Sequence, residues 1–189
     1  MNKSWRVDET YLKIQGQDRY LWRALDSTGQ TIDFLLTAKR DAEAAKRFFG
    51  KALQAEANPQ PRVINVDRNA AYPTAIEQLK AEDTLRQRCR LRQCKFLNIV
   101  EQDHRFVKKR VWLAKGYGSF LSAWRTVQGI EAMNMIRKGR VRRVAKDAVL
   151  AQSRFIDQLF GLTAWRLHVA PHPPLSPVRT FTKLRNKTC

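Results

Sequence analysis

An amphipathic helix pattern enclosed by strand-like runs constrains the fold of this chain more than any other feature. Apolar residues recur at the i, i+3, i+4, i+7, i+8 spacing of one helical face, at Ala45, Phe48, Phe49, Ala52 and Leu53. Asp41 precedes this stripe and suits an N-cap. A helix with one apolar face needs a sheet or other helices to cover it, so the runs on either side decide the fold class.

Strand patterns lie on both sides of this helix. Three runs of alternating or β-branched residues precede it, at residues 5–14, 19–26 and 31–36. Turn formers at 26–29 separate the second run from the third, so the three predict an antiparallel meander. After the helix, the apolar run 63–66 closes on Asp67 and predicts a buried strand that ends at a surface crevice. This succession indicates an α/β protein.

Weaker patterns continue the alternation of helices and strands. We expect the chain to turn at Tyr72 and Pro73 and to form a helix from about Thr74 to Lys80. The run LRQRCRLRQC follows at residues 85–94. If it is a strand, one exposed face carries its alternating arginines, Arg86, Arg88, Arg90 and Arg92.

Three further helices are expected in the second half of the chain, from Asn98 through Lys109 or beyond, from Ser119 to about Lys138, and over 148–160. In the middle one of these, the inward stripe is expected to be Phe120, Trp124, Val127 and Ile130.

The organisation predicted from these patterns has three parts. Residues 1–138 form the core, and residues 139–164 form a basic connector with an amphipathic helix. Residues 165–189 contain four prolines within seven positions and no periodic apolar pattern, so we expect a disordered tail.

The charge of the chain is strongly uneven. It has 36 Lys and Arg against 17 Asp and Glu, a formal net charge of +19. Residues 1–85 carry 13 basic and 12 acidic side chains, whereas residues 86–189 carry 23 basic and 5 acidic ones. A half this cationic predicts a polyanionic partner, nucleic acid or an anionic membrane.

The remaining composition narrows the setting. No run approaches the roughly 18 apolar residues of a membrane span, and the opening MNKSWRVDE has no apolar signal core. Three cysteines are too few for a disulfide framework, and we expect free thiols. We therefore expect a cytoplasmic, nucleoid-associated protein with no membrane partner.

Three carboxylates on three separate elements are the candidate chemistry. Asp8 lies in the first strand, Asp67 ends the fourth, and Glu101 lies on the helix after the fifth. Converging carboxylates can hold two divalent cations that activate an attacking oxygen and stabilise a leaving oxygen. Hard oxygen ligands favour Mg²⁺ or Mn²⁺.

Each acid also has a plainer interpretation. Asp8 and Glu9 are neighbours on opposite faces of a strand, and alternation does not say which of them enters the site. Asp67 also suits a turn. Glu101 lies three residues after Asn98, which is the spacing of a capping box.

Basic residues follow Glu101 on the same helical face. His104, Arg105 and Lys108 lie at +3, +4 and +7, the arrangement that a metal ligand beside bound phosphates needs, although ion pairing on a solvated face explains the same spacing. The predicted DNA-binding set is His104, Arg105, Lys108, Lys109, Arg110, Arg86, Arg88, Arg90 and Arg92.

At this point the chain resembles a known family, the transposases of the insertion sequence 6 family, over residues 4 to about 164. The motifs that carry the resemblance are WRVDETYLKI, TIDFLLTAKRDAEAAKRFF, VINVD, LNIVEQDHRFVKKR and GIEAMNMIRKG. The resemblance implies a ribonuclease H-like fold, with a five-stranded mixed sheet flanked by helices, C-terminal helices and a flexible tail.

The resemblance also implies an Asp-Asp-Glu site. Matched to the family motifs, DET supplies Asp8, VINVD supplies Asp67 and IVEQDHR supplies Glu101, which together would hold two Mg²⁺ or Mn²⁺ ions. Lys108 is then the basic residue seven positions after the glutamate. The implied reaction is metal-dependent 3′-end cleavage and strand transfer of DNA, with cointegrate formation.

The resemblance implies partners as well. These are DNA, as transposon ends and as target, and other transposase subunits in a homo-oligomer or a mixed oligomer with a full-length relative. Family members carry a helix-turn-helix region ahead of WRVDET, and here seven residues precede Asp8, so a shortened chain is expected. The alternative function is a catalytically impaired remnant that binds DNA non-specifically or inhibits a full-length transposase.

Overall fold

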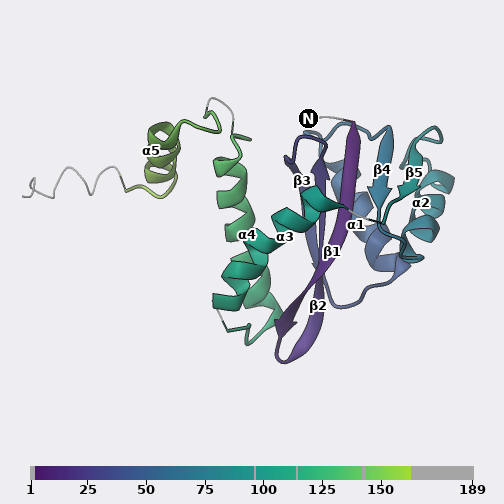
Figure 1. The fold of residues 1–189 in the computed structure, drawn as a ribbon, viewed down its shortest axis with the longest axis horizontal. Helices are drawn as coiled ribbons and strands as arrows, with labels where there is room; N and C mark the ends of the chain where they lie inside the picture. Colours follow the sequence, from purple (N-terminus) through teal and green to yellow (C-terminus); the bar gives the residue numbers. More distant parts are fainter. Residues whose placement is uncertain (1–2, 96, 114, 142–143, 163–189) are drawn as a thin grey trace, which may run out of the picture.

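A five-stranded mixed sheet forms the centre of the computed structural model (Figure 1), which describes residues 3–95, 97–113, 115–141 and 144–162. The strand order is β3-β2-β1-β4-β5. The strands are β1 (Ser4–Ile14), β2 (Gln17–Asp26), β3 (Thr31–Thr37), β4 (Val63–Val66) and β5 (Arg90–Gln93). The first three pair antiparallel, and β4 and β5 run parallel to β1. The expected meander is therefore confirmed.

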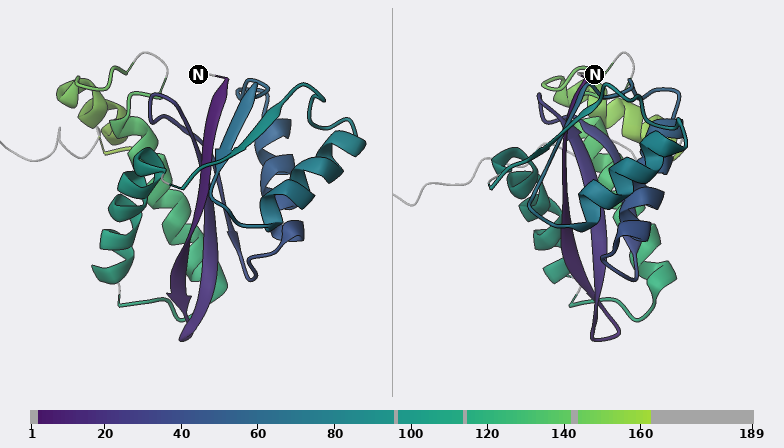
Figure 2. Two further views of the ribbon diagram at one scale, coloured as in Figure 1. Left: turned by 45° about the vertical axis from the view of Figure 1, so that its right-hand side comes forward. Right: turned by 90° about the vertical axis from the view of Figure 1, so that its right-hand side faces the viewer.

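Helices cover both faces of this sheet (Figure 2). Helices α1 (Ala42–Gln54) and α2 (Ala71–Ala81) pack on one face, and α3 (Asn98–Leu113) and α4 (Phe120–Arg137) lie on the other. Side chains of β1 contribute to a hydrophobic core on each face of the sheet. Trp5 and Val7 pack in the core that contains residues of α1 and α2, and Leu12 and Ile14 pack in the core that contains residues of α3 and α4.

Helix α1 forms as its sequence predicts. The Asp41 side chain accepts a hydrogen bond from the Ala44 backbone N–H at 2.8 Å, which satisfies one of the free donors of the first turn. Ala45, Phe48, Phe49 and Ala52 are buried. Phe48 stacks on Trp22 of β2, with ring centroids 6.3 Å apart, and this contact fixes the helix on the sheet.

Helix α2 begins earlier than expected. It starts at Ala71, so the predicted turn at Tyr72 and Pro73 is wrong. Pro73 lies in the first helical turn, where backbone N–H groups have no intrahelical partner and proline costs little. Burial of Tyr72 between the sheet and α1 favours this early start, since its ring contacts both Trp22 and Phe49.

Strand β5 is shorter than the expected run. Only Arg90–Gln93 pair with β4, while Arg86 and Arg88 lie in the turns before it. The segment is held there because Leu85 and Cys89 are buried in the core. Cys89 and Cys94 are free, as expected, whereas Cys189 lies outside the described residues.

Helix α4 presents most of the expected stripe to the core, because Val127 is buried and Trp124 and Ile130 pack against the same cluster. Its Ser119 N-cap is confirmed, but Phe120, the first residue of the helix, is 42% exposed. The buried positions are Ala123, Val127, Glu131, Asn134 and Ile136. Glu131 lies against Arg23 of β2, which is also completely buried.

Arg23 joins both helices of this face to the sheet. Its Nε lies 2.8 Å from Oε1 of Glu131 on α4, and its Nη2 donates a hydrogen bond to Asp103 on α3. Lys138, just after α4, lies 2.8 Å from the other oxygen of Asp103. Burial would raise the pKa of Asp103, but these two cations hold it below its usual value.

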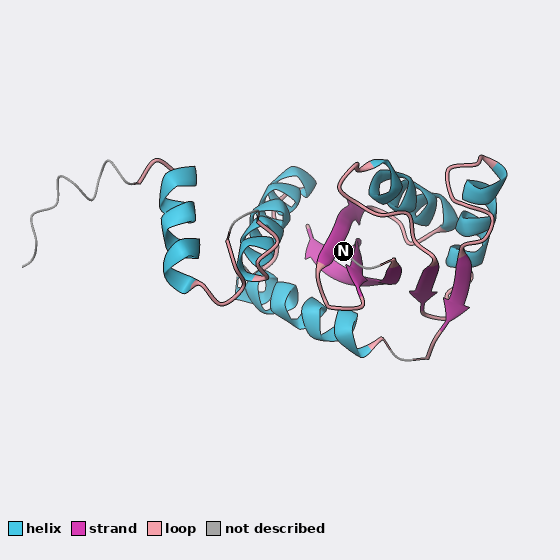
Figure 3. Cartoon of the chain, turned by 90° about the horizontal axis from the view of Figure 1, so that it is seen from above, coloured by secondary structure: helices cyan, strands magenta, loops and turns pink. Residues whose placement is uncertain are grey.

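The expected C-terminal helix is present as α5 (Val149–Leu159), which lies beyond α4 and away from the sheet (Figure 3). Val149 and Leu150 are more than 70% exposed, so the described residues do not cover its apolar side. The predicted tail, 165–189, lies outside the described residues. Within the part described, no helix is long and apolar enough to cross a membrane.

The buried ion pair generates a stability prediction. We expect Glu131→Gln to lower the free energy of unfolding by about 3 kcal/mol, because it leaves a buried guanidinium without one of its two counter-charges. Urea denaturation would measure the loss. Glu77→Gln, on the exposed side of α2, is the matched control and should change stability by less than about 0.5 kcal/mol. Equal effects from the two variants would contradict the prediction.

Candidate active site

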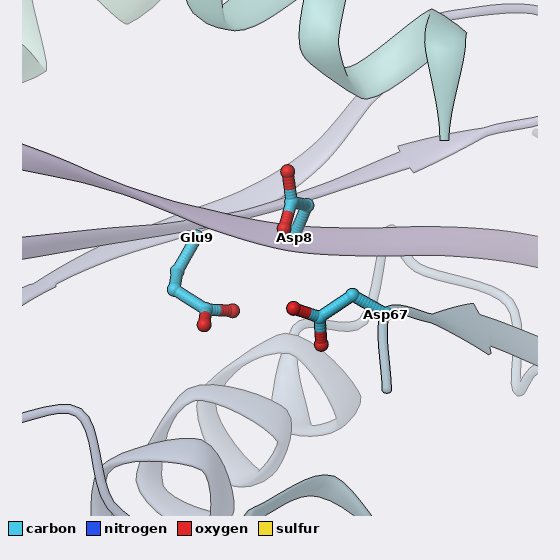
Figure 4. Close-up of side chains that lie close together, drawn as sticks. All are labelled: Asp8, Glu9 and Asp67. Carbon is cyan, nitrogen blue, oxygen red and sulfur yellow. The ribbon is translucent and has the colours of Figure 1, made fainter. Parts of the chain in front are cut away.

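The candidate site lies where β1 and β4 run side by side. Arg6 of β1 is opposite Asn65 of β4, so two residues further along, Asp8 and Asp67 reach the same level of the sheet. One carboxylate oxygen of each of Asp8, Glu9 and Asp67 lies within 4.8 Å of the others (Figure 4). The structure thus brings together two of the three predicted acids and adds a third acid, Glu9.

Glu9 is the most enclosed member of this acidic group. Its side chain is 2% exposed and accepts hydrogen bonds from Arg40 and from the Tyr72 hydroxyl. The Asn69 side chain donates a third at 3.2 Å. Alternation places Glu9 and Asp8 on opposite faces of β1, and Figure 4 shows the Glu9 carboxylate facing that of Asp67 while Asp8 points to the other side of the strand. One oxygen of Asp8 nevertheless lies within 4.8 Å of an oxygen of each of the other two. The sequence pattern left open whether Asp8 or Glu9 enters the site, whereas in the structure both belong to the acidic group.

Asp67 has two roles in this geometry. Its Oδ1 accepts a hydrogen bond from the Asn69 backbone N–H at 3.0 Å, which is the turn contact that its position after a strand suggested. Its Oδ2 lies 3.2 Å from Nη2 of Arg40. Arg40 therefore bridges Glu9 and Asp67 and offsets part of their negative charge.

Asp8 lies in an unfavourable position for an ionised carboxylate. Burial, followed by the nearby charges of Glu9 and Asp67, raises its pKa to about 7. His104 of α3 lies close, with Nδ1 3.5 Å from Oδ2 of Asp8. Burial and the nearby Arg23 lower the pKa of His104 to about 3, so this histidine is neutral and does not compensate the acid.

Glu101 lies in the first turn of α3, outside the close group of three carboxylates. Its Oε1 accepts a long hydrogen bond, 3.4 Å, from the Leu97 backbone N–H. The capping-box interpretation of the sequence predicted that Glu101 caps the backbone N–H of Asn98, and in the structure it caps the N–H of Leu97, one residue earlier. Glu101 is exposed and near enough to contribute to the raised pKa of Asp8.

The basic residues of α3 divide between the core and the surface. Arg105, Lys108, Lys109 and Arg110 are exposed, as a DNA-facing stripe requires. His104 departs from the expected stripe, because it is 5% exposed and faces Asp8. A buried neutral histidine does not suit a contact with phosphate, so we withdraw it from the predicted DNA-binding set.

A family model described as a DDE domain matches residues 2–140 of this chain. The chain belongs to this family. Among curated proteins it is similar to the transposase for insertion sequence-like element IS431mec of Staphylococcus aureus, at 34% identity over 134 residues. The transposase for insertion sequence element IS257 in transposon Tn4003, also from S. aureus, matches equally. The resemblance to the insertion sequence 6 family is thereby confirmed.

The two staphylococcal matches cover 71% of this chain and 58% of each relative. The chain therefore spans less than two thirds of the length of these relatives. A shorter match, 34% identity over 82 residues, relates it to the uncharacterized protein pYV0051 of Yersinia pseudotuberculosis, covering 43% of this chain and 77% of that one.

One of the similar solved structures, that of BIV integrase, supports the fold. The catalytic core domain of BIV integrase is 13% identical and covers 85% of this chain and 99% of its own, with a TM-score of 0.51. The HTLV-2 integrase catalytic core domain is 16% identical over 56% of this chain and 66% of its own, with a TM-score of 0.45. The fold is ribonuclease H-like, as expected.

The raised pKa of Asp8 generates a prediction about metal-free stability. Because the folded pKa lies above the unfolded one, protonated Asp8 favours the folded state at low pH, and this contribution is lost as pH rises through about 7. Asp8→Asn cannot ionise. Its melting temperature should therefore rise relative to the parent between pH 5 and pH 8, by at least about 2 °C, the change that 1 kcal/mol produces in a protein of this size.

Thermal unfolding in the presence of a chelator would test this. Asp83→Asn is the control, because Asp83 is exposed and its left-handed backbone, φ 53°, accommodates asparagine. The difference in melting temperature between Asp83→Asn and the parent should not change between pH 5 and pH 8. If the difference in melting temperature between Asp8→Asn and the parent is also constant over this range, Asp8 ionises normally and the prediction is wrong.

Arg40 generates a second prediction. Arg40→Gln removes the cation shared by Glu9 and Asp67, so the metal-free protein should melt at least about 2 °C lower. The same change removes a cation that competes with Mg²⁺ for the carboxylates. The rise in melting temperature on adding Mg²⁺ should therefore be larger in the variant than in the parent. Arg47→Gln, exposed on α1, is the control. An unchanged or smaller Mg²⁺ effect would contradict the role of Arg40.

Proposed function

We propose that this chain is the catalytic part of a DNA transposase that carries out metal-dependent 3′-end cleavage and strand transfer, with cointegrate formation as the outcome. The observation that carries the proposal is the gathering of Asp8 and Asp67 at one level of two adjacent parallel strands, in a chain of the DDE-domain family. The raised pKa of Asp8 supports it, because uncompensated carboxylates favour a bound cation.

The residues present fit divalent cations. Carboxylate oxygens of Asp8 and Asp67 lie within 4.8 Å of each other and of one from Glu9, and Mg²⁺ and Mn²⁺ prefer oxygen ligands. We assign the two ions to Asp8, Asp67 and Glu101. Bound there, the cations would activate the attacking oxygen and stabilise the leaving oxygen of a phosphodiester.

Glu101 lies outside the close group, and we propose that it joins the site when cations bind, because α3 places it near Asp8. Two contacts hold this part of α3 against the sheet. Asp103, two residues after Glu101, accepts a hydrogen bond from Arg23, and His104, three residues after Glu101, lies beside Asp8. The 3.4 Å contact of Glu101 with the Leu97 N–H is weak, so exchanging it for a cation costs little. Glu9 has a different role, since its three hydrogen bonds hold Arg40, Asn69 and Tyr72 around Asp67.

The two chemical steps use the same exchange at phosphorus. In cleavage, the oxygen of water bonds to phosphorus and the bond to the 3′ oxygen breaks, which frees a 3′-hydroxyl. In transfer, that 3′ oxygen bonds to a target phosphorus, and a target 3′ oxygen leaves with a proton. In each step one P–O bond forms as another breaks, so neither step needs a redox partner. Cleavage converts a phosphodiester into a phosphomonoester and a hydroxyl, whereas transfer conserves the number of phosphodiesters.

The exposed cations of α3 are proposed to hold DNA beside the acids. Lys108 lies on the helix face of Glu101, and its Nζ lies 4.8 Å from the Tyr11 ring, which orients the side chain. The proposed partners are transposon ends, target DNA and further transposase subunits, as a homo-oligomer or a mixed oligomer with a full-length relative. The proposed location is the cytoplasm, on the nucleoid.

A second function is favoured by one observation, the position of Glu101 outside the close acidic group. On that alternative, the chain is a catalytically impaired remnant whose cationic half binds DNA non-specifically or inhibits a full-length transposase. The two functions differ in one respect, because only the enzyme converts DNA in a metal-dependent manner.

Strand transfer from a duplex with a free 3′-hydroxyl into a supercoiled plasmid, with Mg²⁺, would test the proposal. Asp8→Asn, Asp67→Asn and Glu101→Gln should each lower the rate at least about a hundredfold, since cations held by these groups supply several kcal/mol. Glu77→Gln should retain the parent rate. Full activity of Glu101→Gln would assign that residue to capping, and an inactive parent that suppresses transfer by a full-length relative would support the inhibitor.

A further inference from the structure

Cationic side chains converge on a hollow that lies apart from the acidic site. Its volume is about 480 Å³. Six basic residues line it, Lys3, Arg62, Arg86, Arg88, Arg90 and Arg92. They come from the start of β1, the start of β4, and β5 with the turns that precede it. Residues distant in the sequence therefore form one positive surface.

Backbone contacts hold this hollow together. The Lys3 carbonyl accepts a hydrogen bond from the Arg62 N–H at 2.7 Å, and the Arg62 carbonyl accepts one from the Arg90 N–H at 3.0 Å. Buried Leu85 and Cys89 hold the segment that carries Arg86 and Arg88. The arginines are thus placed by strand pairing and core packing.

The charge of this hollow is not compensated by any side chain that the structure describes. Among the described residues, none of the six cations forms an ion pair or a side-chain hydrogen bond. The residues outside that part contain no aspartate or glutamate, so they offer no acidic side chain. Six unpaired cations around one concavity concentrate a positive potential that attracts a polyanion.

Most of the hollow lies away from the acidic group. Lys3 and Arg62 precede β1 and β4, whereas Asp8 and Asp67 lie at the opposite end of the paired segment. The four steps from Val63 to Asp67 span about 13 Å along the strand. Arg92, opposite Asn65, is nearer to the level of Asp67. A phosphate held at the Lys3 and Arg62 end of the hollow is therefore not the phosphate that reacts at the carboxylates.

We propose that this hollow is a second DNA-binding site, which holds backbone phosphates of duplex DNA away from the reacting phosphate. Guanidinium groups match phosphate oxygens in bidentate geometry. Among the described residues, no aromatic side chain lines the hollow, so these residues offer no surface on which bases stack. The proposed contact is with the phosphate backbone.

The choice of DNA over another polyanion rests on the proposed function and on shape. A concavity of this size admits a protruding phosphodiester, whereas a membrane presents a broad, flat array of headgroups. In a transposition reaction, a contact of this kind would hold either a distant part of the reacting duplex or a second duplex, and both present the same backbone chemistry.

Salt-dependent binding of a 30-base-pair duplex, without divalent metal, would test the site. The test variant is Arg88→Gln, Arg90→Gln and Arg92→Gln together, three exposed residues without partners in the described part of the chain. The slope of log K against log salt should weaken by about 2 to 3, since each lost phosphate contact changes it by about 0.9. The melting temperature should hold or rise, because like charges are removed.

The control variant removes the same charge elsewhere, as Lys39→Gln, Arg47→Gln and Arg125→Gln, all exposed. It should change the slope by less than about 1. Equal slopes in the two triple variants would overturn the site, because net charge alone would then explain binding. Preferential, hollow-dependent binding to phosphatidylserine vesicles over DNA would overturn the assignment to DNA.

The outcome is separable from the proposed function. Duplex binding is measured without divalent metal, whereas strand transfer requires it. If the parent shows no strand transfer while the hollow variant still has a weaker slope of log K against log salt, the second DNA-binding site is supported and the proposed enzymatic function is not. If transfer proceeds and the hollow variant binds like the parent, the second site is wrong.

Discussion

The buried Arg23 guanidinium is the interaction on which the candidate site depends most. It lies opposite Asp8 in the pairing of β1 with β2, and it holds Asp103 of α3 and Glu131 of α4. Pairing of this buried charge fixes both helices on the same face of the sheet, since an unpaired guanidinium there would cost several kcal/mol. Through α3 it sets the place of Glu101, and its charge helps to keep His104 neutral beside Asp8.

Charge is separated along the strands that carry the site. At one end, Asp8, Glu9 and Asp67 gather with Arg40 as partial compensation. At the amino ends of the same strands, six cations line a hollow without acidic partners in the described chain. The sheet thus presents one region suited to divalent cations and another suited to phosphates, which is the pairing that a reaction on DNA requires.

Much of the fold was predictable from local pattern. The strands at residues 5–14, 19–26 and 31–36, the Asp41 cap and the stripe of α1 follow from periodicity, because each is decided by neighbours in sequence. The errors have identifiable causes. Burial of Tyr72 began α2 early, and Phe120 is exposed because it lies at the first position of α4, whereas Glu131 is buried against Arg23.

By itself, the sequence determined the order of elements, the separation of acidic and basic regions, and the positions of Asp8 and Asp67 at strand level, since these depend on spacing and composition. Only the tertiary structure decided that Glu9 joins the acids, that His104 is buried, and that Glu101 lies at the edge of the group. Those outcomes depend on distances between elements that no local pattern encodes. Alternation places Glu9 and Asp8 on opposite faces of β1, and only the folded chain brings Asp67 within 4.8 Å of an oxygen of each.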